Sequence, residues 1–344
     1  MANALFDPGR EGFLLGQIDW DTAVFKMALV RGYTFSAAHK FVSDVTGAGG
    51  TLVATSAALS SITGTSGVAD AAANLVHVSP PKPPTTLRKA YLGSSDFSAL
   101  TGTTPTCHRH YYGLSGNGFN PQAALSRTQD DAKANRLTLL SIGPAGVAGK
   151  PDLNALSAFY PALKANPNLA FIPWHEPEDD KVTPADYNTW CKALITEARR
   201  NVPGLKTSYC FMAYTTRPGG PIQNWLNALD LSMYDYAGFD AYSNQATGTP
   251  AAPGPQWPYI LKIAQDQHKP LIVAETGQNN DKGDPAVFWQ NVLAFTQAHP
   301  EVFAVSWWPQ KGPNGDHTPT AASKASFQNA LGKDPYVNVT GAKV

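Results

Sequence analysis

The second part of the chain alternates between short apolar runs and longer segments in which apolar residues recur every three or four positions. The short runs are typical of buried strands and occupy 89–93, 108–113, 137–143, 169–174, 205–214, 236–242, 270–275 and 302–308. The longer segments have helical spacing and occupy 122–135, 153–165, 184–201, 259–267, 286–299 and 321–331. Eight strand–helix units in about 250 residues predict an α/β fold of the (β/α)8 TIM-barrel type rather than a doubly wound sheet.

Local signals support this division into elements. Thr183-Pro184 and Asp284-Pro285 each place a capping side chain before a proline that suits the first turn of a helix. Neither a GxGxxG nor a GxxxxGK[ST] motif follows any of the strands. The sequence therefore lacks the phosphate-binding loop that a nucleotide-binding function would need.

The first 78 residues follow a different pattern. Apolar runs at 22–30, 51–60 and 68–78 alternate with Gly-rich turn signals, which predicts a small β-rich module. Four prolines in the six residues 79–84 indicate an extended linker. We therefore expect a module at 1–78, a linker at 79–86 and a barrel domain at 87–344. So small a module, with few large apolar side chains, is expected to need a partner or a second copy.

Composition narrows the range of functions. The 344 residues include 26 Lys and Arg and 26 Asp and Glu, so no net charge favours nucleic acid or an anionic membrane. Three scattered cysteines, Cys107, Cys191 and Cys210, form no disulfide framework and no Cys/His pattern for a metal, so we expect no cofactor. The N-terminus lacks the pattern of a cleaved signal peptide, and the longest apolar runs are too short to span a membrane.

Two glutamates are the main candidates for chemistry. Glu176 follows the fourth apolar run and Glu275 ends the seventh. The carboxyl ends of barrel strands form the active-site face of this fold, so both side chains are expected at the barrel mouth. Cleavage of a glycosidic bond needs one carboxyl group to protonate the leaving oxygen and a second to attack or to activate water. The pair therefore indicates a glycosidase.

Other strand ends carry residues that suit a sugar. Indole rings stack on pyranose faces, and His, Asp and Tyr side chains hydrogen-bond to hydroxyl groups. An acidic run at 178–180 follows Glu176, and such runs are usually solvated loop residues. The candidate substrate-binding residues are Trp174, His175, Asp240, Tyr242, Trp307, Trp308, His108 and His110.

The barrel half, about 87–332, resembles the retaining glycoside hydrolases of clan A and is most similar to glycoside hydrolase family 26. The resemblance lies in His175-Glu176, in Gly238-Phe239-Asp240-Ala241-Tyr242 and in the Trp307-Trp308 pair. It implies that Glu176 is the acid/base, that Glu275 is the nucleophile and that Tyr242 hydrogen-bonds to Glu275. Ile172 and Thr276 depart from the family pattern, which puts mannan specificity in doubt.

The N-terminal module resembles small tail-associated structural proteins of bacteriophages. The resemblance covers residues 1–21 and the segments 41–44 and 67–70. It implies a virion-anchored protein, oligomeric in the phage tail and assembled in the host cytoplasm, with other tail proteins as partners of residues 1–78. The function expected is a tail-associated, endo-acting glycoside hydrolase that cleaves a β-linked host cell-surface polysaccharide. The alternatives are a non-catalytic glycan-binding tail protein on the same fold and a purely structural tail protein.

Overall fold

The computed structural model describes residues 28–31, 46–47, 49–55, 90–143, 151–180, 182–244, 246, 248–312 and 315–333. The chain divides into two compact units, Met1–Thr86 and Leu87–Val344, which are described separately. In the first unit, β1 (Ala28–Arg31) pairs antiparallel with β2 (Thr51–Thr55). The predicted strand 68–78, the linker 79–86 and the segments that resemble phage proteins lie outside the described residues.

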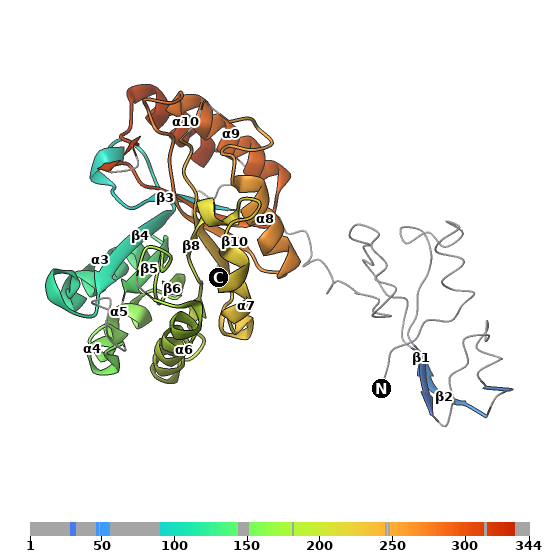
Figure 1. Cartoon of the computed structure of the whole chain (residues 1–344). Coiled ribbons are helices and arrows are strands. Elements are labelled where there is room, and N and C mark those ends of the chain that lie inside the picture. The colour runs from blue at the N-terminus through green and yellow to red at the C-terminus, as the bar shows by residue number, and fades with distance from the viewer. Residues whose placement is uncertain are drawn as a thin grey trace, which may run out of the picture. The chain divides into compact units, whose positions relative to one another are not determined.

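A parallel sheet forms the centre of the second unit (Figure 1). Its strands follow the order β7-β6-β5-β4-β3-β11-β10-β9-β8. They are β3 (Tyr91–Ser94), β4 (Cys107–Gly113), β5 (Leu137–Gly143), β6 (Leu169–Ile172), β7 (Lys206–Thr207), β8 (Phe211–Met212), β9 (Ala237–Asp240), β10 (Leu271–Thr276) and β11 (Val302–Trp307).

The two ends of this sheet belong to one stretch of chain. β7 pairs with β6 and β8 pairs with β9, although only three residues separate β7 from β8 in the sequence. Single bridges from His175 to Cys210 and from Ser208 to Tyr236 continue the two pairings through the interruption. The sheet therefore curls into a barrel-like form in which the predicted fifth strand is split.

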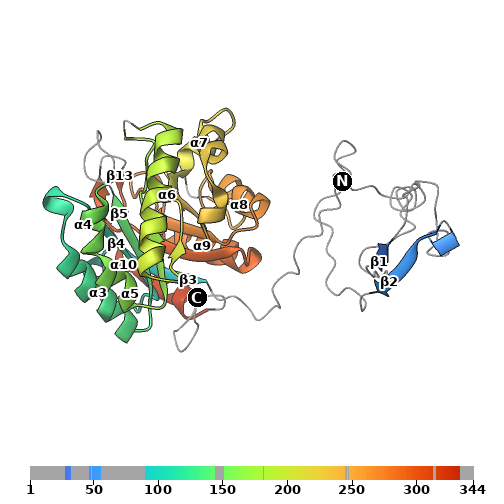
Figure 2. The same cartoon turned by 90° about the horizontal axis from the view of Figure 1, so that it is seen from below.

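Helices surround the curled sheet (Figures 1 and 2). Thr183 and Asp284 cap their helices as predicted, by accepting from the backbone N–H groups of Asp186 and Ala286. The helices are α3 (Pro121–Lys133), α4 (Leu153–Ser157), α5 (Tyr160–Ala165), α6 (Pro184–Asn201), α7 (Ile222–Ala228), α8 (Trp257–Asp266), α9 (Pro285–Ala298) and α10 (Ala321–Leu331).

Each of the eight predicted apolar runs forms a strand, and each predicted helical segment contains a helix. Two further differences from the prediction concern the helices. The segment 153–165 is two helices, α4 and α5, because Pro161 suits only the first turn of a new helix. α7, which is short, was not predicted. In the described residues, no helix is long and apolar enough to cross a membrane.

The strands bury both faces, and alternate side chains enter different cores. Leu137 and Leu139 of β5 belong to a cluster of small and apolar residues inside the sheet, together with Cys107 and Ile172. Leu140 of β5 instead packs outside, in a cluster with residues of α5 and α6. This alternation decides which residues of each strand can reach the barrel mouth.

Candidate active site

Three carboxyl groups meet at one end of the sheet. Glu176 follows β6, Asp240 ends β9, and Glu275 lies near the end of β10. One carboxylate oxygen of each residue lies within 4.8 Å of one oxygen of each of the others. We call these three residues the carboxyl cluster.

The backbone places each of these carboxyl groups by a different device. Asp240 points inward through strand alternation. Glu275 follows a shift of register with β9 between Val273 and Glu275, an irregularity of the kind that re-aims a side chain. Glu176 has a φ of 50°, in the left-handed region that non-glycine residues seldom adopt, and its N–H donates to the Cys210 carbonyl at 2.9 Å. Such backbone strain occurs preferentially at functional sites.

Glu275 is held by hydrogen bonding and by a buried cation. Its side chain accepts a 2.5 Å hydrogen bond from the Tyr242 hydroxyl group, and the residue is only 7 % exposed. The guanidinium of Arg109 is buried beneath the cluster, where its Nη1 donates to Ser141 Oγ at 2.6 Å. Its positive charge acts on both Glu275 and Asp240. These contacts fix the position of the Glu275 carboxyl group at the end of the sheet.

Glu176 has the opposite electrostatic environment. Burial and the negative charge of Glu275 raise the pKa of the Glu176 carboxyl group to about 7. An acid that works near neutral pH needs a pKa in this range, whereas an ordinary glutamate would be almost fully ionised. Glu176 can therefore hold a proton close to neutral pH, at a short distance from Glu275.

His175 and Trp308 complete this end of the sheet. The His175 ring contacts Tyr111 edge-on at a centroid distance of 5.4 Å, and burial followed by the charge of Arg109 lowers its pKa to about 3. His175 is therefore neutral. Trp308, half-buried, contacts the Tyr242 ring edge-on at 6.0 Å. Of the predicted site residues, the structure thus brings together Glu176, Glu275, Asp240, Tyr242, His175 and Trp308.

The other four predicted site residues lie elsewhere, and their predicted contact with substrate does not fit this placement. Trp174 stacks on Trp190 of α6 and donates to Asp180. Trp307 packs against Trp289 of α9 and donates to the His317 carbonyl. Both indoles face helices rather than the barrel mouth.

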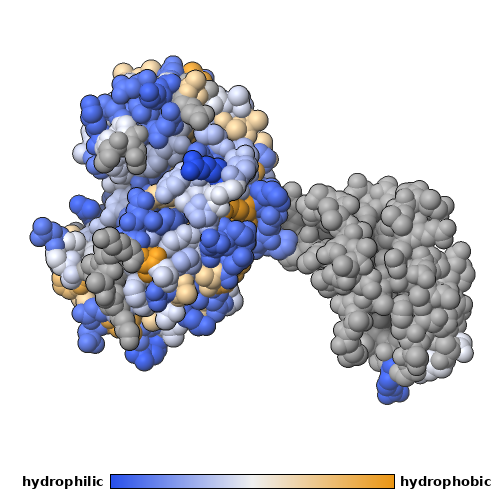
Figure 3. Space-filling model, in the orientation of Figure 1, coloured by the Kyte–Doolittle hydropathy of each residue, from blue (hydrophilic) through white to orange (hydrophobic). Residues whose placement is uncertain are grey.

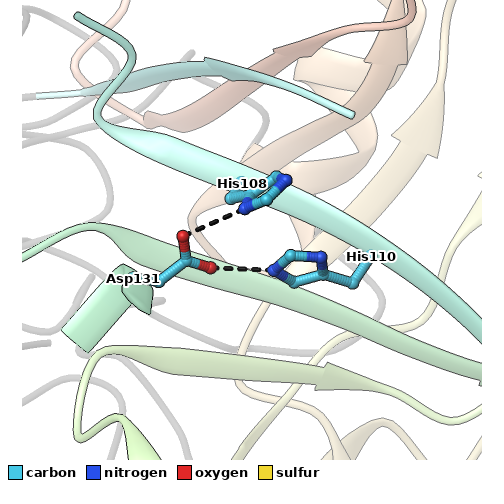
Figure 4. Close-up of side chains that lie close together, drawn as sticks. All are labelled: His108, His110 and Asp131. Atoms are coloured by element: carbon cyan, nitrogen blue, oxygen red, sulfur yellow. Dashed lines mark hydrogen bonds and ion pairs between the residues drawn. The ribbon is translucent and has the colours of Figure 1, made fainter. Parts of the chain in front are cut away.

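His108 and His110 lie on the outer face of β4, beneath α3. His108 Nδ1 lies 3.0 Å from Asp131 Oδ1, and His110 Nε2 lies 2.8 Å from Asp131 Oδ2 (Figure 4). The Asp131 carboxylate also accepts from Thr138 at 2.9 Å and from Arg136 at 3.4 Å. Side chains alternate along a strand, so both histidines point away from the carboxyl cluster. We call His108, His110 and Asp131 the histidine cluster.

In each cluster the possible ligand atoms lie within 4.8 Å of one another, a spacing that could hold a divalent cation. In the histidine cluster, however, four donors already occupy the oxygens of Asp131. In the carboxyl cluster, Arg109 already provides a buried positive charge. We therefore assign no metal to either group. A cavity of about 430 Å³ lies near the histidine cluster, lined by Phe97, Thr106 and Arg136 among others, and Glu176 and Glu275 are not among its lining residues.

Sequence reasoning missed four residues of this region. Arg109 and Tyr111 alternate with the histidines and share the inward face with Cys107. The alternation of side chains along the strand could therefore have identified them. Glu178, expected to be solvated, is largely buried and accepts from the Met212 N–H at 2.9 Å. Tyr214, 45 % exposed, lies in the turn after β8, where the charges of Asp179, Glu178 and Glu176 act on its hydroxyl group.

No protein-family model matches the sequence, and no curated protein matches it. Solved structures do match the fold. A family 26 β-mannanase from Bacteroides ovatus is 14 % identical, with 72 % of this chain and 89 % of that chain covered and a TM-score of 0.56.

A modular endo-β-1,4-mannanase of family 26 from Cellulomonas fimi is 15 % identical, covers 74 % of each chain and has a TM-score of 0.54. An endo-β-1,4-glucanase from Xanthomonas axonopodis pv. citri, with three substitutions, is 12 % identical, with 70 % of this chain and 98 % of that chain covered and a TM-score of 0.51. At these identities the matches show a shared TIM-barrel-like fold.

Proposed function

We propose that the second unit is a retaining glycoside hydrolase. The observation that carries the proposal is the pairing of Glu176 and Glu275, with carboxylate oxygens within 4.8 Å and unlike electrostatic environments. Retaining glycosidases hold their two carboxyl groups about 5–5.5 Å apart, whereas inverting enzymes need about 6.5–9.5 Å to fit a water molecule. The fold shared with mannanases and a glucanase supports the same reading.

The reaction would proceed in two steps. The Glu275 carboxylate attacks the anomeric carbon while the Glu176 carboxyl group transfers its proton to the leaving oxygen. This step forms a glycosyl ester on Glu275 and leaves Glu176 ionised. Glu176 then takes a proton from water, which attacks the same carbon and releases Glu275. Tyr242 holds Glu275 in position throughout by donating to its carboxylate.

Aromatic rings on two sides of the cluster suit a chain of sugars. Trp308 contacts Tyr242, which donates to Glu275, and the charge of Glu176 acts on the Tyr214 hydroxyl group. We assign Tyr214 to the side of the leaving group because Glu176 would protonate the leaving oxygen. Figure 3 shows a largely hydrophilic surface on this unit, with apolar residues scattered. We propose that the substrate is a neutral β-linked polysaccharide that is cleaved internally.

The biological setting is also proposed, and it rests on the sequence resemblance of residues 1–78 to phage tail proteins. In this setting the first unit anchors the protein, as an oligomer, to other tail proteins of a virion assembled in the host cytoplasm. The second unit then cleaves the polysaccharide of the host cell surface.

The test uses the full chain and a panel of β-mannan, β-1,3-xylan, β-glucan and purified bacterial envelope glycan. We expect the release of reducing ends from one member of the panel, with the product anomer matching that of the bond cleaved. Glu275→Ala should abolish release, and azide should restore turnover as a glycosyl azide of inverted configuration, because a small anion can replace the missing carboxylate.

Two outcomes would overturn the proposal. One is a Glu275→Ala variant that releases reducing ends as fast as the parent. The other is a glycan that binds to the protein and is never shortened, which would establish the non-catalytic alternative. A product of inverted configuration would contradict the retaining mechanism but not the glycosidase activity.

A further inference from the structure

Asp240 is buried with few hydrogen-bond donors. The residue is 4 % exposed, and its Oδ1 accepts a hydrogen bond from the Cys210 thiol at 3.2 Å. Among the described residues, no N–H or O–H group donates to its Oδ2. A thiol is a weak donor, and a buried carboxylate with so little support is costly.

The carboxyl oxygens of Asp240 and Glu176 lie within 4.8 Å of each other, and this closeness gives the observation a chemical meaning. Two ionised carboxylates have four acceptor oxygens between them and no donor, so they cannot hydrogen-bond to each other. A contact between two carboxyl groups becomes a hydrogen bond only when one of them carries a proton.

The charge balance around Asp240 leads to the same requirement. If all three carboxyl groups of the cluster were ionised, three negative charges would face one buried cation, Arg109. With protons on two of the three carboxyl groups the cluster is neutral overall. The titratable groups that face Asp240 are Glu176, Glu275, Arg109 and Cys210, with Tyr111 and Tyr242 adjoining.

We propose that Asp240 is a protonated carboxylic acid at neutral pH and that its Oδ2–H donates to Glu176. The catalytic consequence rests on the proposed glycosidase function. Asp240 is then a positioning residue, which stabilises the ionised form of Glu176 that is needed as the base in the second step. Burial, followed by the charges of Glu275 and Glu176, raises the pKa of Asp240 well above its usual range, which agrees with this assignment.

The first experiment measures the proton directly and does not require activity. Difference infrared spectra at pH 7 between the wild-type chain and Asp240→Asn should contain the C=O stretch of a buried carboxylic acid. The band should persist when the wild-type protein is brought to pH 9. Cys210→Ser should shift its frequency, because a stronger donor then reaches Oδ1.

Glu178→Gln is the matched control for this assignment, since Glu178 is a second largely buried carboxyl group close to Glu176. It should remove a different band. Absence of a carboxylic acid band from the wild-type minus Asp240→Asn spectrum would overturn the proposal, whether or not any glycan is cleaved. The same band unshifted in Cys210→Ser would also contradict it.

The second experiment uses the pH profile of kcat/KM, whose alkaline limb reports the acid Glu176. Asp240→Asn should lower kcat but leave this limb in place, because a neutral donor replaces a neutral donor. Asp240→Ala should move the limb upward by about 1 pH unit, because the ionised form of Glu176 loses its hydrogen bond. An ionised Asp240 predicts the opposite sign: both variants would remove a like charge and move the limb downward.

Discussion

The histidine cluster lies against the outer face of β4, and the carboxyl cluster lies on the side of Arg109, which points inward from the same strand; each cluster contains a buried aspartate. Asp131 is fully buried and accepts from four donors, so hydrogen bonds from His108 and His110 hold its pKa well below its usual value against the effect of burial. Asp240 is almost as buried but accepts only a thiol. Burial alone therefore does not fix the state of a carboxyl group. The supply of donors separates a structural aspartate from one that shares the chemistry of a site.

The largest expected effect is on turnover at the carboxyl cluster. Glu275→Gln should lower kcat by roughly 10⁴-fold or more, because the nucleophile is lost. Its melting temperature should change little, since glutamine keeps the size of the side chain and an oxygen that can accept from Tyr242. Steady-state kinetics and thermal unfolding measure both quantities. A less stable variant with retained turnover would reverse the roles given to the two clusters.

Asp131 should have the opposite pattern. Asp131→Asn replaces one acceptor oxygen by a donor, facing groups that already donate, and should destabilise the fold by about 3 kcal/mol or more. Turnover of the folded fraction should be retained. Asp130→Asn is the matched control, because its exposed side chain pairs only with Lys133. Denaturant unfolding of both variants makes the comparison, and equal stability of the two would contradict it.

Glu178, which lies close to the carboxyl cluster, and His110 of the histidine cluster should also give the protein opposite responses to pH. Burial raises the pKa of Glu178 to about 8, above its unfolded value, so the native state binds the proton more tightly and its stability falls as pH rises from about 4.5 to about 8. Burial lowers the pKa of His110 to about 4, so stability falls as pH drops from about 6.5 to about 4.

Glu178→Gln tests the alkaline side of this pattern. Relative to the wild-type protein, its melting temperature should be higher at pH 9 and equal or lower at pH 5, because glutamine resembles the protonated acid. A melting-temperature difference of the same size at both pH values would show that Glu178 does not titrate in this window.

The smallest expected effect concerns the rim of the site. Tyr214→Ala should raise KM for a polymer by about threefold to tenfold, which corresponds to about 1 kcal/mol of lost ring contact. The effect should be absent for an aryl glycoside that lacks sugars on the leaving-group side. Tyr259→Ala is the matched control, with a tyrosine of similar exposure, 41 %, on α8. Equal KM values for the two variants would show that Tyr214 does not contact the substrate.

The sequence was sufficient to locate the strands, their ends and most helices, but not to tell which face of a strand each side chain occupies. Apolar runs and caps located the strands and most helices, because burial and capping leave local patterns. His108 and His110 lie one residue of alternation away from the inward face, and Arg109 between them is the residue that faces the carboxyl groups. The structure places Trp174 and Trp307 against helices, because an indole at a strand end can pack against a helix equally well.

The parts of the site that escaped prediction depend on contacts between distant segments. Nothing local distinguishes Glu178, which is buried because the chain after β8 returns to cover it. The same holds for Tyr214 and for the left-handed backbone of Glu176, which is set by a hydrogen bond to Cys210.

The three free cysteines are all buried, in three different environments. Cys107 lies inside the sheet, Cys191 on α6, and Cys210 beside Asp240. Burial raises the pKa of each thiol, so none is reactive while its surroundings stay closed. The rate at which an alkylating reagent labels each cysteine therefore measures how often that part of the barrel opens. The three cysteines are natural probes of local unfolding.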